Sequence, residues 1–376
     1  MSNDSSNSIE RLRASLCELT GKSHCLLTGR GASAIYLALK ALDRPPGKVL
    51  VPAVTCPTAI FPILYAGHEP VFCDINLEDY NANSAGLKRI LEERTDVVAV
   101  LAIHSFGHLV DLENLARECR ERGVFLIEDL CQALGATPGG KVPPGNWGDV
   151  SVLSFGYSKP VDAGDGGAVL TGDSRLAERI HEEALLLPEK PADFDELENR
   201  YRAAYYRAED QARAKGTAPP SHLTLAKPFR AMHLFRAGHA FAGPAVKQIE
   251  ELEARMQMRR QRANAYRELL AGLPLLLPVY NAGSNPWRFT FLVEDPALHR
   301  PLTEGLRARG FHASNWYPSL PARFGIGFEE SVTRFSNARY FERRVINLWV
   351  DDTMTGETIE ETARFIHDFI KNVKVK

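Results

Sequence analysis

A single lysine, Lys159, stands between an apolar run and a glycine-rich tract in SVLSFGYSKPVDAGDGGAVLTGD, residues 151 to 173. The apolar run ends at Ser154, and the tract reads Gly164-Asp165-Gly166-Gly167. A lysine a few residues past a buried strand is most often a solvated loop residue. At the end of a strand that lines a site, however, the same amine can attack a carbonyl group. The rest of the chain has to decide between these interpretations.

Three further stretches place chemically useful groups next to predicted strands or turns. Glu128 and Asp129 follow an apolar run, where a carboxylate needs a partner, although an aspartate that caps the next helix explains the pattern equally well. The small-residue turn at 26–35, LLTGRGASAI, opens a helix whose free N–H groups could bind a phosphate. His104 and His108 follow another apolar run. One of them could line a pocket, but a hydrogen-bonded structural histidine is the plainer interpretation.

Short apolar runs rich in β-branched residues have to position these groups. They predict buried strands at Lys48–Pro52, Pro70–Asp74, Val97–Ile103, Val124–Ile127, Val150–Ser154 and Ala168–Thr171. Amphipathic segments at 87–94 and 112–122 are long enough for crossover helices. The alternation predicts an α/β domain around a mainly parallel sheet, with its site at the carboxyl ends of the strands.

The second half of the chain has a different pattern. Residues 174–237 are helical and charged, and the segment 195–215 carries an aromatic and basic set: Tyr201, Tyr205, Tyr206, Arg202 and Arg207. This helix is either solvated with a core-facing aromatic stripe or reshapes the substrate side. A long amphipathic segment at 245–270 leads to a strand at 287–293, a helix at 302–309, a strand at 344–350 and a helix at 355–371. We therefore expect a large domain, 1–244, and a compact α+β domain, 245–376.

Composition excludes several classes of protein. The 376 residues are 44% hydrophobic and 24% charged with a formal net charge of −2, which is typical of a globular protein with a sizeable core. No segment is basic enough to suggest a nucleic-acid partner, and no apolar run is long enough for a membrane span or signal peptide. The six cysteines have neither C-x-x-C nor metal-like spacing, so we expect a reduced, cytoplasmic chain without a metal site.

An amine, a carboxylate and an anion site are together what a pyridoxal phosphate enzyme requires. Four motifs occur here in order: VPAVTCPTAIFPILYAGHEPVFCDI, HSFGHLVDL, IEDLCQALGA and SFGYSKPVDAGDGGAVLTGD. They resemble the DegT/StrS family of pyridoxal-phosphate-dependent aminotransferases, many of which aminate keto groups on nucleotide-activated sugars. The resemblance covers most of residues 20–180 and, more loosely, 244–371. It implies fold type I, the aspartate-aminotransferase fold: a mainly parallel seven-stranded sheet between helices, plus a smaller C-terminal α+β domain.

The resemblance also implies roles for particular residues. Lys159 occupies the position of the Schiff-base lysine, and Asp129 that of the aspartate that pairs with the pyridine nitrogen. The remaining cofactor-binding positions are Gln132 beside the ring hydroxyl, Ser154 and the amides of Gly31, Ala32 and Ser33 at the phosphate, and Cys56 against the ring. Relatives that perform dehydration carry histidine at the lysine position, so Lys159 favours transamination.

Several positions depart from the family pattern. Cys56 stands where an aromatic residue often stacks on the ring, and Ala32 stands where a threonine is usual. An Asn-Tyr-Arg-like segment, which serves the neighbouring subunit's site in many members, reads GHAFAGP at 238–244 here. These changes leave the cofactor chemistry credible and the nucleotide-sugar substrate open.

We therefore expect transfer of an amino group from glutamate or glutamine to a keto or aldehyde group, foremost on a nucleotide sugar. The alternatives are an aminotransferase for a non-sugar metabolite and a cofactor-binding sensor or scaffold without turnover. Binding alone would not need both Lys159 and Asp129, which argues against the sensor. The resemblance also implies a homodimer in which residues near 228–243, with Phe229, Phe235 and Phe241, reach the partner's cofactor. Folding back onto their own domain explains these three rings nearly as well.

Overall fold

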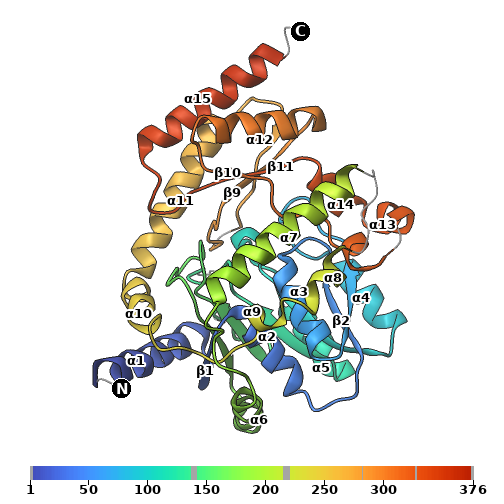
Figure 1. Cartoon of the computed structure of the whole chain (residues 1–376). Coiled ribbons are helices and arrows are strands. Elements are labelled where there is room, and N and C mark those ends of the chain that lie inside the picture. Colours follow the sequence, from blue (N-terminus) through green and yellow to red (C-terminus); the bar gives the residue numbers. More distant parts are fainter. Residues whose placement is uncertain (1–2, 137–141, 215–220, 282, 327, 374–376) are drawn as a thin grey trace.

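A seven-stranded sheet forms the centre of the computed structural model, which describes residues 3–136, 142–214, 221–281, 283–326 and 328–373 (Figure 1). Its strands are β1 (His24–Thr28), β2 (Lys48–Pro52), β3 (Glu69–Cys73), β4 (Val97–Ile103), β5 (Phe125–Asp129), β6 (Val150–Ser154) and β7 (Gly167–Thr171). They lie in the order β1-β7-β6-β5-β4-β2-β3. Strands β2 to β6 run parallel, whereas β7 is antiparallel to both β6 and β1.

Helices cover this sheet and explain why its strands are apolar on both faces. In β4 six of the seven residues of VVAVLAI are buried, as expected for a parallel strand between two helical layers. The helices before the linker are α1 (Asn3–Thr20), α2 (Gly31–Lys40), α3 (Pro57–Tyr65), α4 (Ser84–Glu93), α5 (Glu113–Arg122), α6 (Ser174–Leu185), α7 (Phe194–Ala214), α8 (Ser221–Ala226) and α9 (Arg230–His233). None of the helices in the described ranges is long and apolar enough to cross a membrane.

A second, antiparallel sheet is built from the C-terminal part of the chain. Its order is β10-β11-β9-β8, with β8 (Leu275–Leu276), β9 (Phe289–Val293), β10 (Ala313–Ser314) and β11 (Val345–Leu348). The helices α12 (His299–Ala308) and α15 (Gly356–Val373) lie over it at the top of Figure 1. Its apolar cluster, which includes Phe289, Leu302 and Ile366, is separate from the large core around the seven-stranded sheet.

All six predicted strands are present, and the predicted α/β fold with a mainly parallel seven-stranded sheet is confirmed. Strand β1 was missed because its five residues, HCLLT, are short and polar at the start, and we expected only a turn there. The single amphipathic helix expected at 245–270 is two helices, α10 (Ala242–Glu250) and α11 (Leu252–Leu269), with Glu251 between them. The expected domain boundary at 244/245 falls within α10 and stays a prediction.

Candidate active site

Lys159 lies in the loop that follows β6, which is held by a carboxylate of the loop itself and by an indole from the second half of the chain. Ser158, just before the lysine, has a left-handed backbone (φ 66°), and its N–H donates to the Asp162 carboxylate at 2.6 Å. The Trp287 indole N–H donates to the Ser158 carbonyl at 2.6 Å. The Lys159 amine is half-buried and lies 5.6 Å from the centre of the Trp287 ring. The loop therefore presents one amine to the inside of the site rather than to bulk solvent.

Asp129 ends β5, the strand next to β6, so both groups lie at the same edge of the sheet. Its carboxylate is buried and accepts the Cys131 N–H at 2.8 Å. No helix begins between β5 and β6 in the described part of the chain, so this bond closes a turn, and the alternative in which Asp129 caps a helix is wrong. The bond leaves the second carboxylate oxygen for another partner. Burial raises the pKa of the Cys131 thiol well above its ordinary value; the nearby Asp129 charge raises it further and Lys159 lowers it. The carboxylate and the amine are therefore both near one buried thiol.

Gln132 is fixed at both ends of its amide. The side-chain oxygen accepts the Phe106 N–H at 2.6 Å, and the side-chain N–H₂ donates to the Tyr317 hydroxyl at 3.0 Å. Tyr317 in turn stacks on Trp287, with ring centres 6.1 Å apart and planes 6° from parallel. Trp287 and Tyr317 were not recognised as site residues from the sequence. Trp287 looked like the start of a strand, and Tyr317 lies 185 positions from Gln132.

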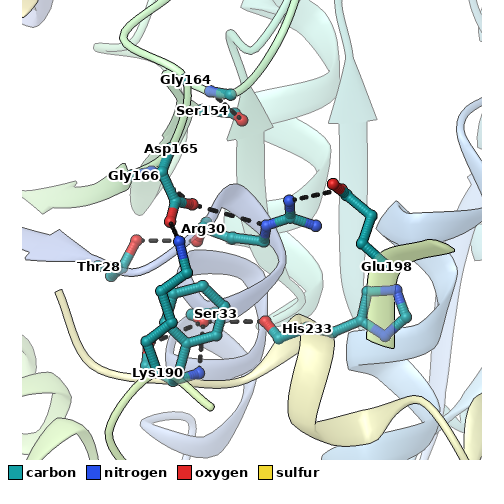
Figure 2. A network of polar contacts seen from close by, with 12 residues as sticks. Thr28, Arg30, Ser33, Ser154, Gly164, Asp165, Gly166, Lys190, Glu198 and His233 are labelled. Carbon is teal, nitrogen blue, oxygen red and sulfur yellow. Dashed lines mark hydrogen bonds and ion pairs between the residues drawn. The ribbon is translucent and has the colours of Figure 1, made fainter. Parts of the chain in front are cut away.

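The N-terminus of α2 packs closely on the glycine-rich tract, and we call the residues that meet there the phosphate cradle: Gly31, Ser154, Gly166 and Gly167. Figure 2 labels Ser154 and Gly166 of this group. A Cβ on Gly31 would come within 2.9 Å of the Ser154 Cβ, and one on Gly167 within 2.7 Å of the Gly31 nitrogen. The first N–H groups of a helix have no partner within that helix, so they can bind an anion. Ala32 has no hydroxyl, and the Ser33 hydroxyl donates to the His233 carbonyl at 3.0 Å. Only the backbone N–H groups of these two residues remain for a phosphate.

Cys56 precedes α3 and is half-buried, with its thiol 3.0 Å from the Thr58 hydroxyl. Burial raises the pKa of Tyr317 well above its usual value, with Cys56 as the next contribution and Asp129 a smaller one. Cys56 and Asp129 therefore both lie near Tyr317. The structure thus places an amine, a carboxylate and the start of a helix at one edge of the sheet, and this set of groups fits pyridoxal phosphate.

Glu128 and His104 do not belong to the site. Glu128 is fully buried; it binds the His104 imidazole at 3.1 Å and accepts the N–H groups of Gly145, Trp147 and Gly148. The other ring nitrogen of His104 accepts the Val110 N–H at 2.9 Å. The histidine is thus hydrogen-bonded and structural. Of the two adjacent acids, Glu128 is structural and Asp129 is the candidate site residue.

His108 is also inside the protein but lies in the seam between the two parts of the chain. It stacks on Tyr280 with ring centres 4.8 Å apart, and the described residues offer neither ring nitrogen a hydrogen bond. Burial lowers the pKa of His108 to about 4, so the ring is neutral near pH 7.

Helix α7 carries the aromatic and basic set noted in the sequence. Its inner face buries Tyr205, whose ring centre is 5.6 Å from that of Trp316, while Arg202, Tyr206 and Arg207 are exposed. Burial raises the pKa of Tyr201 well above its usual value, and the neighbouring Cys56 contributes next, so Tyr201 lies near Cys56. The core-facing aromatic stripe is therefore present, and the role of this helix on the substrate side stays a prediction.

The three phenylalanines between residues 228 and 243 pack within this chain. Phe229, Phe235 and Phe241 are 7%, 1% and 5% exposed. They belong to the chain's own core, so their aromatic character gives no support to an intersubunit contact. The expectation that this segment reaches a partner's cofactor is left without that argument.

A likeness to solved aminotransferases defines the class of fold. The aminotransferase TlmJ from Streptoalloteichus hindustanus superimposes with a TM-score of 0.78 at 21% identity, over 98% of this chain and 92% of that one. A family profile described as the DegT/DnrJ/EryC1/StrS aminotransferase family matches residues 3–367. The chain belongs to this family, which confirms the resemblance, the fold and pyridoxal phosphate as the cofactor of the class.

Two relatives show the range of activities among similar proteins. A UDP-N-acetyl-3-dehydro-alpha-D-glucosamine 3-aminotransferase from Acidithiobacillus ferrooxidans is 26% identical over 94% of this chain and 86% of its own length. A dTDP-4-dehydro-2,6-dideoxy-D-glucose 3-dehydratase from Saccharopolyspora spinosa is 30% identical over 75% of this chain. That match spans 61% of the dehydratase.

Proposed function

We propose that this chain is a pyridoxal-phosphate-dependent aminotransferase that moves an amino group from glutamate or glutamine to a keto group of a nucleotide-activated sugar. The observation that carries the proposal is the placement of the Lys159 amine at the same sheet edge as the buried Asp129 carboxylate and the phosphate cradle. Relatives named for dTDP-, GDP- and UDP-linked sugars support the acceptor class.

Bound pyridoxal phosphate would supply an electron sink for the charge that develops at the donor Cα. Lys159 would hold the cofactor covalently and, once displaced by the donor, move a proton between the donor Cα and the cofactor C4′. Asp129 would keep the pyridine nitrogen protonated, and Gln132, fixed by Phe106 and Tyr317, would lie beside the ring hydroxyl. Gly31, Ala32, Ser33 and Ser154 would hold the phosphate, and Cys56 would pack against the ring.

Lys159 also separates this activity from dehydration. The relatives include a dehydratase, and the family resemblance associates dehydration with histidine at the lysine position. Because a lysine amine can both hold the cofactor and move the proton, the residue at 159 favours transamination. We infer a homodimer as well, as the family resemblance implies. The six cysteines are all free, which fits the cytoplasm.

A spectroscopic experiment tests the proposal. Pyridoxal phosphate is added to the purified protein, then L-glutamate or L-glutamine, and the visible absorbance band is followed. A band that forms with the cofactor and is lost with a donor supports the first half-reaction, and its return with dTDP-, GDP- or UDP-linked keto sugars supports the acceptor class. A protein that binds the cofactor but shows no change with any amino donor would be a sensor or scaffold instead.

A further inference from the structure

Four charged side chains meet beside the phosphate cradle, and no role considered so far uses them. We call Arg30, Asp165, Lys190 and Glu198 the charge cluster (Figure 2). Arg30 Nη2 lies 3.0 Å from Glu198 Oε1, and its Nε lies 3.6 Å from Asp165 Oδ1. Lys190 Nζ lies 2.6 Å from Asp165 Oδ2. The cluster therefore joins the turn before α2, the glycine-rich tract, the segment before α7, and α7 itself.

Arg30 belongs to the rim of the cradle. It is the N-cap residue of α2, directly before Gly31, and its backbone pairs with that of Gly166. A Cβ on Gly167 would come within 2.6 Å of the Arg30 carbonyl carbon. The Arg30 side chain thus starts at the cradle, and its guanidinium lies over the Phe194 ring, 4.7 Å from the centre.

The two residues of α2 that follow Gly31 offer the cradle no free side-chain donor, because Ala32 has no hydroxyl and the Ser33 hydroxyl is bound to the His233 carbonyl. Asp165 accepts the N–H of Gly166 in the cradle at 3.0 Å, and Glu198 pairs with the Arg30 side chain that starts at the cradle; these two carboxylates are only 25% and 37% exposed. A phosphate close to partly buried carboxylates is repelled, and water screens that repulsion incompletely. Something in this chain has to balance these two charges.

We propose that Arg30 is the charge-balancing residue of the phosphate cradle: it neutralises Glu198 and Asp165 so that a phosphate dianion can bind beside them. Lys190 shares the task but is 44% exposed, whereas the Arg30 side chain is 23% exposed and held on Phe194. The proposal rests on the placement of the cofactor phosphate at Gly31, Ala32, Ser33 and Ser154. It does not require any particular donor or acceptor.

The test compares pyridoxal phosphate with pyridoxal, which lacks only the phosphate, in binding titrations followed by absorbance. For Arg30→Gln we expect the Kd of pyridoxal phosphate to rise about ten- to thirtyfold, the size of one lost interaction with a charged group. The Kd of pyridoxal should stay within about threefold, because aldehyde capture by Lys159 is unaffected. Arg175→Gln makes the same charge change at the start of α6, beyond the far end of β7, and should leave both constants unchanged.

The Glu198→Gln variant distinguishes charge balance from a purely structural role of the Arg30–Glu198 ion pair. If Arg30 balances charge, removing the carboxylate leaves the cluster more positive, so the Kd of pyridoxal phosphate should fall or stay constant. The double variant Arg30→Gln with Glu198→Gln should recover most of the affinity lost in Arg30→Gln. If the Arg30–Glu198 pair only holds α7 in place, each single change raises the Kd of pyridoxal phosphate and of pyridoxal alike. The double variant then recovers no affinity, and this result overturns the proposal.

The remaining outcomes are equally decisive. An Arg30→Gln protein that keeps the wild-type preference for the phosphorylated ligand overturns the role of Arg30 while leaving the aminotransferase proposal intact. A wild-type protein that binds pyridoxal as tightly as pyridoxal phosphate overturns the phosphate placement itself. Weaker response to glutamate with unchanged cofactor binding would assign Arg30 to a substrate carboxylate instead.

Discussion

The two sides of the site are built by different means. On the side proposed to bind the cofactor, which we call the cofactor side and which comprises residues 29–33, 129–132 and 154–167, the contacts come from backbone groups, glycines and short polar side chains. On the side proposed to face the substrate, which we call the substrate side and which comprises α7 and residues 316–324, they come from aromatic rings and buried charges. There the Arg323 guanidinium binds Glu209 through two nitrogens at 2.6 Å each and Glu342 at 2.8 Å.

The difference indicates where a substitution acts on chemistry and where it acts on stability. The cofactor side has no space for larger residues, but its functional groups lie at strand ends that the sheet already holds. The substrate side is held by an arginine that is 6% exposed and whose guanidinium also donates to the Ser319 carbonyl at 2.7 Å. We expect changes in functional groups of the first side to remove activity at nearly constant stability, and changes of the second side to lower the free energy of unfolding.

Lys159→Ala should produce the largest effect, because it removes both the covalent anchor and the proton-transfer group. We expect turnover to fall by about a thousandfold or more, with the visible absorbance band lost. The midpoint of thermal unfolding of the cofactor-free protein should change little, since a half-buried loop lysine contributes little packing. Near wild-type turnover in this variant would remove Lys159 from the mechanism.

Asp129→Asn should lower kcat by about a hundredfold or more while leaving most of the cofactor affinity, because a neutral partner does not keep the ring nitrogen protonated. The side chain is isosteric, and its oxygen can still accept the Cys131 N–H. Titration of the cofactor and turnover at saturation separate the two effects. Normal turnover at saturation combined with weak binding would instead assign Asp129 a structural role.

Arg323→Met should destabilise the substrate side by about 3–5 kcal/mol, because two poorly exposed carboxylates lose their common cation. Burial lowers the pKa of Arg323, but Glu342 and Glu209 outweigh it and hold that pKa above its usual value, so the charge is present at every pH of interest. Denaturant unfolding measures the change. Arg334→Met is the matched control: its ion pair with Glu330 is half-exposed, and we expect a loss of about 1 kcal/mol at most.

His108→Phe addresses the seam between the two parts of the chain and should have the smallest effect. The folded pKa of His108, about 4, lies below the ordinary value of 6.5, so the unfolded chain binds one more proton between these values. The stability that depends on the neutral His108 ring is fully present above pH 6.5. As the pH falls from 6.5 toward 4, the free energy of unfolding decreases by about 1.4 kcal/mol per pH unit. The phenylalanine can keep the stacking on Tyr280 and should flatten the stability curve in that window. An unchanged slope would show that the ring is not kept neutral in the folded state.

Much of the cofactor side could be anticipated from the sequence because its residues are local. Lys159 follows Ser154 by five positions, and Gln132 follows Asp129 by three. Ser154 and Asp129 each end a strand that an apolar run in the sequence predicts. The substrate side could not be anticipated in this way. Tyr317 and Gln132 are 185 positions apart, and Arg323 and Glu209 are 114 apart, so no spacing along the chain connects them.

Some local patterns were also undecided until the chain was folded. Glu128 and Asp129 are adjacent acids after one strand, and successive side chains of a strand point to opposite faces. Glu128 therefore meets His104 and the backbone at 145–148, whereas Asp129 lies near Lys159. The three phenylalanines near residues 228–243 were equally ambiguous, and only their burial in the chain's own core decided between the two interpretations.

By itself, the sequence determined the apolar runs that form the strands and the four motifs that indicate the family. These features can be recognised because strand period, helix amphipathicity and turn residues are properties of neighbouring positions. It also determined which residues could do the chemistry, since an amine, a carboxylate and a glycine-rich turn are visible as residue types. Only the tertiary structure decided that Trp287 and Tyr317 stack on each other beside Lys159 and Gln132, and that Tyr205 of α7 packs on Trp316. It likewise joined Arg30 to Glu198 across 168 positions, because packing between distant segments depends on the folded core as a whole and not on any local pattern.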